Sequence, residues 1–307
     1  MSKFAIVFPG QGSQAVGMLA ELGQQYDVVT QTFAQASEVL GYDLWALVQN
    51  GPVEDLNQTF RTQPALLAAS VAIWRVWQSL DLEQPEFLAG HSLGEYSALV
   101  CAGVIDFQQA IKLVELRGQL MQEAVPAGTG AMYAIIGLDD EAIANACQQA
   151  AQGQVVSPVN FNSPGQVVIA GQKEAVERAG VLCKEAGAKR ALPLPVSVPS
   201  HCALMKPAAE KLALALASLE FNAPNIPVIN NVDVIAETDP AKIKDALVRQ
   251  LYSPVRWTEA VQKMSDAGID KLLEVGPGKV LTGLTKRIVK TLDAAAVNDL
   301  ASLDAAK

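Results

Sequence analysis

The chain has 307 residues, 50% hydrophobic and 18% charged, a composition typical of a globular protein that buries a substantial core. Its formal net charge of −9 argues against a nucleic-acid partner, because a protein surface that binds nucleic acid needs clustered positive charge. No apolar run approaches a membrane span, the four cysteines lack CxxC spacing and histidine occurs only twice, so we expect a soluble, cytoplasmic protein without membrane contact, disulfide framework or metal site.

The first 125 residues alternate short apolar strands with helices. This order predicts an α/β fold with a largely parallel, buried sheet. A glycine-rich turn at residues 9–14 follows the first strand. Strands are expected at 4–8 and 86–89, and helices at about 18–40, 64–80, 93–102 and 109–124, with Pro64 in a first turn.

Residues 131–192 follow the order strand, helix, strand, strand, helix, strand, which is typical of a ferredoxin-like βαββαβ unit. Proline- and glycine-rich segments at 125–130 and 193–199 flank it, as expected of a domain boundary. We therefore expect a large α/β domain of residues 1–125 and 199–307, with a small domain inserted at 126–198. The second part of the large domain is predicted to hold helices at about 203–219 and 241–251 and a strand at 271–275, while the alanine-rich tail after residue 292 is weakly informative.

The most informative segment is Gly-His-Ser-Leu-Gly at 90–94, which lies between a predicted strand and a predicted helix. This is the layout of a nucleophile elbow, in which Ser92 is held out from the backbone and the glycines let neighbouring chain pass close by. Free N–H groups at the helix N-terminus would also favour developing negative charge. A plain structural turn is the alternative interpretation of these five residues.

A serine hydroxyl needs a base, and the only histidines are His91 and His201. His91 adjoins Ser92, so we expect it to point elsewhere and to pack or form a hydrogen bond. His201 lies far downstream at the start of a predicted helix, in the serine-then-histidine order of α/β-hydrolase-type enzymes, and is the predicted base. Cys202 beside it is a rival nucleophile, although a buried spectator thiol is the better interpretation.

The base also needs an acceptor for its other ring nitrogen, and no carboxylate is obviously spaced for this. Four residues after Gln250 comes Pro254, which has no N–H for the Gln250 carbonyl to accept from at the end of the predicted helix. This carbonyl is a candidate to orient His201. A helix end that is simply hydrated is an equal alternative.

The N–H groups of the turn at 10–12 and of Leu93 are candidates for an oxyanion hole, because the turn follows a strand and Leu93 follows the nucleophile. The pattern Gly10-x-Gly12-x-x-Ala15 also fits a dinucleotide-binding fingerprint. That fingerprint requires a second strand ending in an acidic residue about 20 residues on, where this sequence predicts a helix.

Arg117 lies in the middle of the apolar face of the predicted helix 109–124. An inward guanidinium must meet a carboxylate or a phosphate, because a buried unpaired charge is costly. The partner is either an Asp or Glu of the protein or, if Arg117 lines the pocket of Ser92, the free carboxylate of an acyl substrate.

Taken together, these features resemble the malonyl-CoA:acyl carrier protein transacylases, the malonyl-loading enzymes of bacterial-type fatty acid synthesis. The resemblance spans nearly the whole chain in the family's order. The matching segments are FPGQGSQ at 8–14, GHSLGEY at 90–96, ELRG at 115–118, VPSH at 198–201, QLYSPVRW at 250–257 and EVGPG at 274–278.

The resemblance implies a hydrolase-like large domain with an inserted ferredoxin-like small domain. It also implies ping-pong transfer of a malonyl group from malonyl-CoA to the phosphopantetheine thiol of holo-acyl carrier protein, with no cofactor and no metal, and we expect a monomer. Ser92 would be the nucleophile and His201 its base. The other implied roles are orientation of the base by the Gln250 carbonyl, oxyanion binding by the N–H groups of Gln11 and Leu93, and binding of the malonyl carboxylate by Arg117.

Carrier proteins of this pathway are acidic, so docking is expected on a local positive surface. The candidates are Lys189, Arg190, Lys286, Arg287 and Lys290.

Two other functions stay open from the sequence: a serine esterase or thioesterase, which delivers the acyl group to water, and a catalytically inactive module that binds acyl carriers. The inward Arg117 and the lack of a carboxylate partner for His201 favour transfer. Whether the carrier serves a fatty acid or a polyketide pathway does not follow from these residues.

Overall fold

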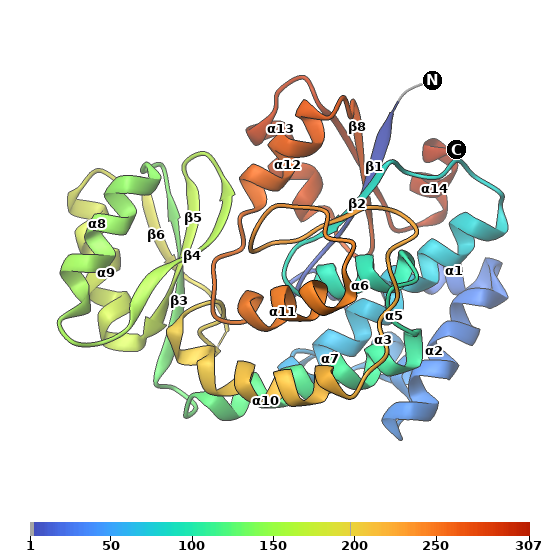
Figure 1. Cartoon of the computed structure of the whole chain (residues 1–307), viewed down its shortest axis with the longest axis horizontal. Coiled ribbons are helices and arrows are strands. Elements are labelled where there is room, and N and C mark those ends of the chain that lie inside the picture. Colours follow the sequence, from blue (N-terminus) through green and yellow to red (C-terminus); the bar gives the residue numbers. More distant parts are fainter. Residues whose placement is uncertain (1–2, 197) are drawn as a thin grey trace.

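The strands of the chain form two sheets of different character, which lie in separate parts of the molecule (Figure 1). The computed structural model describes residues 3–196 and 198–307; Ser197, within the predicted boundary 193–199, lies outside the described residues. One sheet has five parallel strands and the other has four antiparallel strands. The predicted α/β fold class is confirmed.

The parallel sheet has the strand order β7-β2-β1-β8-β9. Its central strand is buried along its whole length, because helices cover both faces of the sheet. This explains the uninterrupted apolar sequence of β1. The strands are β1 (Phe4–Phe8), β2 (Phe87–Gly90), β7 (Val228–Ile229), β8 (Lys271–Val275) and β9 (Asp293–Val297).

Alternate residues of β1 pack into two different cores. Ile6 and Phe8 face the larger core, to which α5 (Thr59–Ser79), α6 (Leu93–Cys101) and α7 (Phe107–Ala124) contribute. Ala5 and Val7 face the smaller core under α12 (Trp257–Asp266) and α13 (Val280–Ile288). The remaining helices of this part are α1 (Ala20–Gln25), α2 (Asp27–Leu40), α3 (Leu44–Asn50), α4 (Val53–Leu56), the 3-10 turn η1 (Ala203–Met205), α10 (Lys206–Ala217), α11 (Pro240–Gln250) and α14 (Leu300–Ala306).

The antiparallel sheet is built entirely from residues 130–193 and has the order β4-β5-β3-β6. The chain runs β3, α8, β4, β5, α9, β6, which is the predicted βαββαβ order. Figure 1 shows α8 and α9 on the side of this sheet that faces away from the parallel sheet. The elements are β3 (Gly130–Ile136), α8 (Asp140–Ala151), β4 (Val156–Ser163), β5 (Gln166–Gln172), α9 (Lys173–Glu185) and β6 (Arg190–Pro193).

Several predicted elements were wrong in detail. The helix predicted at 18–40 is interrupted at Tyr26, whose φ of −127° and ψ of 107° are extended, so two helices form. Helix α5 begins earlier than predicted, so Pro64 lies inside it and not in its first turn. The alanine-rich tail adds β9 and α14, because tertiary pairing with β8 overrides its weak strand propensity. Lys290, one of the docking candidates, was expected on the same late helix as Lys286 and Arg287, but it lies after the end of α13.

The turn from β2 into α6 brings two backbone segments unusually close together. A Cβ added at Gly94 would lie 2.1 Å from the Phe8 carbonyl oxygen in β1, while a Cβ added at Gly283 in α13 would meet no atom within 4 Å. We expect Gly94→Ala to lower the free energy of unfolding by at least about 2 kcal/mol, since backbone must move. Gly283→Ala is the matched control and should raise it by up to about 1 kcal/mol. Urea denaturation of both variants and the wild type measures these free energies. A Gly94→Ala variant as stable as the wild type would contradict the close approach of Gly94 to β1.

Candidate active site

Ser92 lies at the carboxyl end of β2, between the strand and the first residue of α6. Its φ of 53° and ψ of −110° place it in a backbone region that a non-glycine residue rarely adopts. Gly90 and Gly94 permit the turn, because a Cβ at Gly90 would lie 1.9 Å from the Gly94 carbonyl. The sequence therefore folds locally into a sharp turn that projects the serine side chain away from the sheet.

The Ser92 hydroxyl and the His201 ring meet although they are far apart in the sequence. Ser92 Oγ lies 2.7 Å from His201 Nε2. On the other side of the ring, His201 Nδ1 lies 2.7 Å from the backbone carbonyl oxygen of Gln250. This carbonyl ends α11, and Pro254 cannot supply the next helical N–H. With Nδ1–H donating to a carbonyl, Nε2 is left free to accept the serine proton.

Burial and charge keep the His201 ring neutral. Its side chain is almost fully buried, and burial together with the positive charge of Arg117 lowers the pKa of His201 from 6.5 to about 3. A neutral imidazole can accept a proton, so its protonation state suits a general base. The acceptor that fixes its orientation is a carbonyl and carries no charge.

Arg117 is buried beside the serine, with 1% of its surface exposed. Its Nη1 donates to Gln63 Oε1 at 2.9 Å, and its Nη2 donates to Gln250 Oε1 at 3.1 Å and to Ser92 Oγ at 3.3 Å. The guanidinium carbon lies 5.3 Å from the centre of the Tyr96 ring. Among the residues that the structure describes, no Asp or Glu forms an ion pair with Arg117. The charge is thus available to an anionic ligand.

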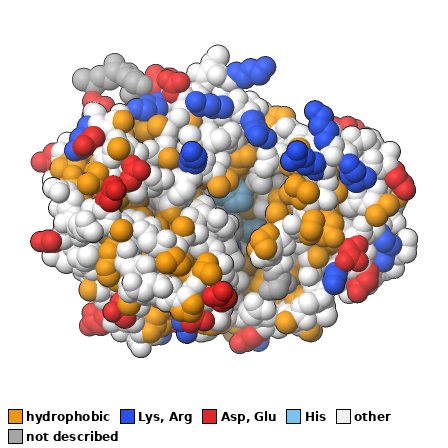
Figure 2. Space-filling model, turned by 180° about the vertical axis from the view of Figure 1, so that it is seen from behind, with side chains coloured by type: hydrophobic (Ala, Val, Ile, Leu, Met, Phe, Trp, Pro, Cys, Tyr) orange, Lys and Arg blue, Asp and Glu red, His pale blue; other side chains and the backbone are white. Residues whose placement is uncertain are grey.

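These side chains open into a pocket of about 490 Å³ between the two sheets. Figure 2 shows this region from outside as a hollow in which histidine is visible, with Lys and Arg side chains gathered along its upper edge. Gln11 and Leu93 both line the pocket, and Leu93 is the first residue of α6, so its N–H has no carbonyl partner within the helix. Met132, Asn160 and Leu194 of the antiparallel unit form part of the wall.

The competing candidates make other contacts. His91 Nε2 is 2.8 Å from Asn162 Oδ1 and its ring packs against Trp257, so it turns away from Ser92. Cys202 is buried with its thiol donating to the Pro199 carbonyl, and burial raises its pKa to about 11. The dinucleotide fingerprint lacks its structural context, because helices and not a second strand follow the turn after β1.

Three buried polar residues of the site were not identified from the sequence. Gln63 accepts from Arg117, Asn231 accepts from the Ser92 N–H at 2.8 Å, and Glu95 accepts from both Asn231 and Gln250. A signal for Glu95 exists, since a charged residue one helical turn after the elbow serine is unusual in an otherwise apolar helix. The other two come from distant segments and give no local signal.

Within residues 3–196 and 198–307, no group of three or more His, Cys, Asp and Glu side chains is arranged to hold a metal ion. In the same part of the chain, no helix is both long and apolar enough to cross a membrane.

An elbow serine bonded to a buried histidine on this fold defines the class of serine-dependent acyl-transfer enzymes. The family model described as acyl transferase domain matches residues 5–304. The malonyl CoA-acyl carrier protein transacylase of Haemophilus influenzae is 72% identical over 306 residues, covering 99% of this chain and 98% of the relative. This chain belongs to the acyl transferase family and, within it, to the malonyl-CoA:acyl carrier protein transacylases.

Solved structures agree with this assignment. An acyl carrier protein S-malonyltransferase from Vibrio cholerae O1 biovar eltor is 86% identical, with a TM-score of 0.98 and complete coverage of both chains. A malonyl-transacylase solved in complex with a type II PKS acyl-carrier protein is 72% identical, with a TM-score of 0.99 and 99% coverage of each chain.

The burial of both histidines predicts their titration. Burial lowers the pKa of His91 as well as that of His201, so both rings should titrate below the ordinary value, and the His201 ring, with its pKa of about 3, should remain neutral from pH 8 down to about pH 5. Nitrogen-15 NMR of the imidazole rings should show no transition near 6.5, the ordinary value for histidine. A ring that becomes charged between pH 6 and pH 7 would contradict the burial and the lowered pKa values described above.

Proposed function

We propose that Ser92 and His201 carry malonyl transfer from malonyl-CoA to acyl carrier protein, in fatty acid synthesis, through a malonyl-serine ester. The observation that carries this proposal is the unpaired, buried Arg117 guanidinium beside the Ser92 hydroxyl. A malonyl group differs from an acetyl group by a free carboxylate, which is the ligand that such a guanidinium binds best.

In the first half-reaction, His201 Nε2 takes the proton of the Ser92 hydroxyl while Oγ attacks the thioester carbonyl of malonyl-CoA. The N–H groups of Gln11 and Leu93 donate to the oxyanion that forms, and the positive end of α6 favours the same charge. The C–S bond then breaks, and the CoA sulfur leaves with the proton from Nε2. The product is an oxygen ester on Ser92.

In the second half-reaction the phosphopantetheine thiol of the carrier gives its proton to Nε2 and attacks the ester carbonyl. When the C–O bond breaks, Ser92 Oγ recovers the proton. Both half-reactions exchange one ester for another at a single base. The reaction therefore balances without an oxidant, a reductant or a metal ion.

Arg117 also links substrate binding to the strength of the base. After burial, its positive charge is the largest cause that lowers the pKa of His201. A malonyl carboxylate bound to the guanidinium offsets that charge, so the pKa of His201 rises when the correct substrate is in place. The same binding draws Nη2 away from Ser92 Oγ, which frees the hydroxyl for attack.

The two sheets belong to two proposed domains with different roles. We propose that residues 1–125 and 199–307 form the catalytic domain, which carries Ser92, His201 and Arg117, and that residues 126–198 form the small domain that closes one wall of the pocket. Backbone hydrogen bonds between β4 and Val255 connect the two units beside the pocket: Phe161 N–H donates to the Val255 carbonyl at 3.0 Å and Val255 N–H donates to the Val159 carbonyl at 2.8 Å.

The proposed partner is a holo-acyl carrier protein. A related transacylase has been solved with its acyl-carrier protein. For this chain, the proposed docking surface consists of Lys189, Arg190, Lys286, Arg287 and Lys290. We also propose that the enzyme acts as a monomer in the cytoplasm, where buried cysteines stay reduced; all four cysteines here are free and buried.

The nucleophile is tested by trapping the acyl-enzyme. Incubation with malonyl-CoA alone should add one malonyl group, which peptide mass mapping places on Ser92, and holo-carrier protein should remove it. Ser92→Ala should stay unlabelled. Free malonate without a loaded carrier would indicate a thioesterase, and an unlabelled wild-type protein would indicate a binding module.

The carboxylate-binding role predicts a change of selectivity. Arg117→Ala should lower the rate of Ser92 malonylation about 10- to 100-fold relative to acetylation, because only the malonyl group loses a charge-assisted hydrogen bond. Lys112→Ala is the control, since Lys112 lies on the same helix in an exposed pair with Glu115. Equal losses with malonyl-CoA and acetyl-CoA would contradict this role.

A further inference from the structure

Glu95 is a buried carboxylate next to the active site that the reaction described above does not use. It lies in the first turn of α6 with 2% of its surface exposed. Its Oε2 accepts from the Asn231 backbone N–H at 2.9 Å and from Gln250 Nε2 at 2.9 Å. Together with Asn231 and Gln250 it forms what we term the Glu95 network.

Asn231 fixes the backbone of the nucleophile elbow. Its side-chain Nδ2 donates to the Gly90 carbonyl at 2.7 Å and its Oδ1 accepts from the Ser92 N–H at 2.8 Å. A neighbouring parallel strand would make the same two bonds on either side of His91. Because β7 ends at Ile229, the Asn231 amide extends the hydrogen bonding of the sheet beyond the end of that strand.

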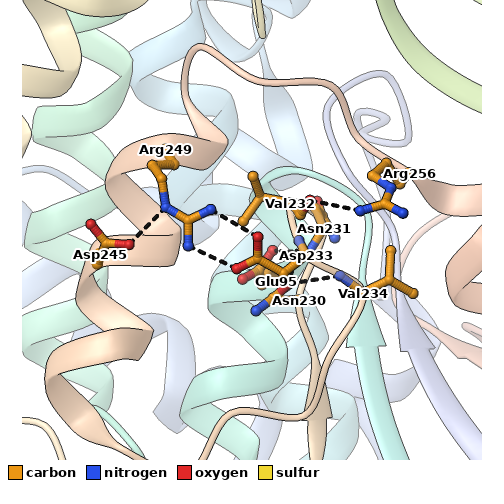
Figure 3. A network of polar contacts seen from close by, with 9 residues as sticks. All are labelled: Glu95, Asn230, Asn231, Val232, Asp233, Val234, Asp245, Arg249 and Arg256. Atoms are coloured by element: carbon orange, nitrogen blue, oxygen red, sulfur yellow. Dashed lines mark hydrogen bonds and ion pairs between the residues drawn. The ribbon is translucent and has the colours of Figure 1, made fainter.

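Two arginine side chains, Arg249 and Arg256, hold the loop that carries Asn231. Figure 3 shows Glu95 behind Asp233, with the Arg249 side chain on one side of this loop and the Arg256 side chain on the other. Arg249 donates to both carboxylate oxygens of Asp233, at 2.9 Å and 2.7 Å, and Arg256 donates to the Val232 carbonyl at 3.2 Å.

Gln250 connects the Glu95 network to the reacting groups. Its Nε2 donates to Glu95 and, at 3.1 Å, to the Ser92 carbonyl, while its Oε1 accepts from Arg117 Nη2. A carboxylate can only accept hydrogen bonds, so Glu95 requires the NH₂ end of the Gln250 amide. The oxygen end is thereby turned toward Arg117. Glu95 thus fixes the orientation of the group that holds the guanidinium.

The network also explains how Arg117 stays free for a ligand. A carboxylate in direct contact with the guanidinium would occupy the position that a malonyl carboxylate needs. Here the Gln250 amide lies between Glu95 and the guanidinium, so the carboxyl group supports Arg117 indirectly. This arrangement holds the buried cation without blocking it.

We propose that Glu95 is a positioning residue for acyl selectivity, which acts through Gln250 to hold Arg117 in the orientation that binds a substrate carboxylate. This inference rests on the proposed malonyl transfer. The wild-type trapping experiment therefore comes first, because a wild-type enzyme that fails to accept malonyl from malonyl-CoA would refute the function itself and not only the role of Glu95.

The test is the ratio of single-turnover acylation rates of Ser92 with malonyl-CoA and with acetyl-CoA. Glu95→Ala should lower this ratio at least about tenfold, because the Gln250 amide loses the acceptor of its shortest hydrogen bond and with it part of the support that orients it. Glu95→Gln should restore most of the ratio, since its amide oxygen can accept both hydrogen bonds. Loss of selectivity in the alanine variant with rescue by glutamine supports the proposal.

Glu274→Ala is the matched control. Glu274 is equally buried, with 1% exposure, and accepts from Leu281 and Thr282 at the start of α13. Its removal should lower stability but leave the ratio unchanged. The proposal is overturned if Glu95→Ala keeps the wild-type ratio of malonylation to acetylation rates. It is also overturned if this ratio is as low in Glu95→Gln, or in Glu274→Ala, as it is in Glu95→Ala.

If Glu95→Ala yields no folded protein, Glu95→Asp replaces it. The aspartate keeps the charge but is one methylene too short to accept from Asn231 and Gln250 together. A ratio lowered several-fold then supports positioning by Glu95, and an unchanged ratio overturns it.

Discussion

The site depends on the burial of one positive charge without a carboxylate in contact with it. Arg117 lies in the core, held by the side-chain carbonyls of Gln63 and Gln250 and by the face of Tyr96. These partners are polar but neutral, so they orient the guanidinium and leave its charge largely uncompensated. An anionic acyl group would complete the proposed site, and this is the physical basis that we propose for a preference for a dicarboxylic acyl chain.

Gln250 is the residue through which the parts of the site are connected. Its backbone carbonyl orients His201, while its side-chain amide contacts Arg117, Ser92 and Glu95. In a serine hydrolase with an aspartate beside the histidine, the orienting group carries a charge. Here the neutral carbonyl at the end of α11 takes the place of the carboxylate, and the pKa of His201 responds mainly to burial and to Arg117.

The fold positions these groups because the carboxyl ends of parallel strands meet at one edge of the sheet. The turn after β1, the elbow after β2 and the asparagines after β7 come together there. Of these three strands, β1 and β2 were predicted from the sequence and β7 was not. The antiparallel unit then closes the pocket from the side. Strand β7 has two residues, so an asparagine side chain completes its pairing where the backbone no longer can.

The sequence by itself determined the features that have local causes. Two of these are the orders of elements: alternating strands and helices in the large unit, and βαββαβ in the small one. The others are the glycines of the elbow, the proline that leaves the Gln250 carbonyl without a helical donor, and the inward helix face on which Arg117 lies. Each follows from periodicity, from steric limits on φ or from a missing N–H. Only the tertiary structure decided what Arg117 touches and that Glu95 and Asn231 support Ser92, because these contacts join segments that are distant in the sequence: Arg117 and Gln63 are 54 positions apart, and Asn231 and Ser92 are 139 apart. Such pairings depend on how the strands and helices assemble in space, and no local pattern encodes them.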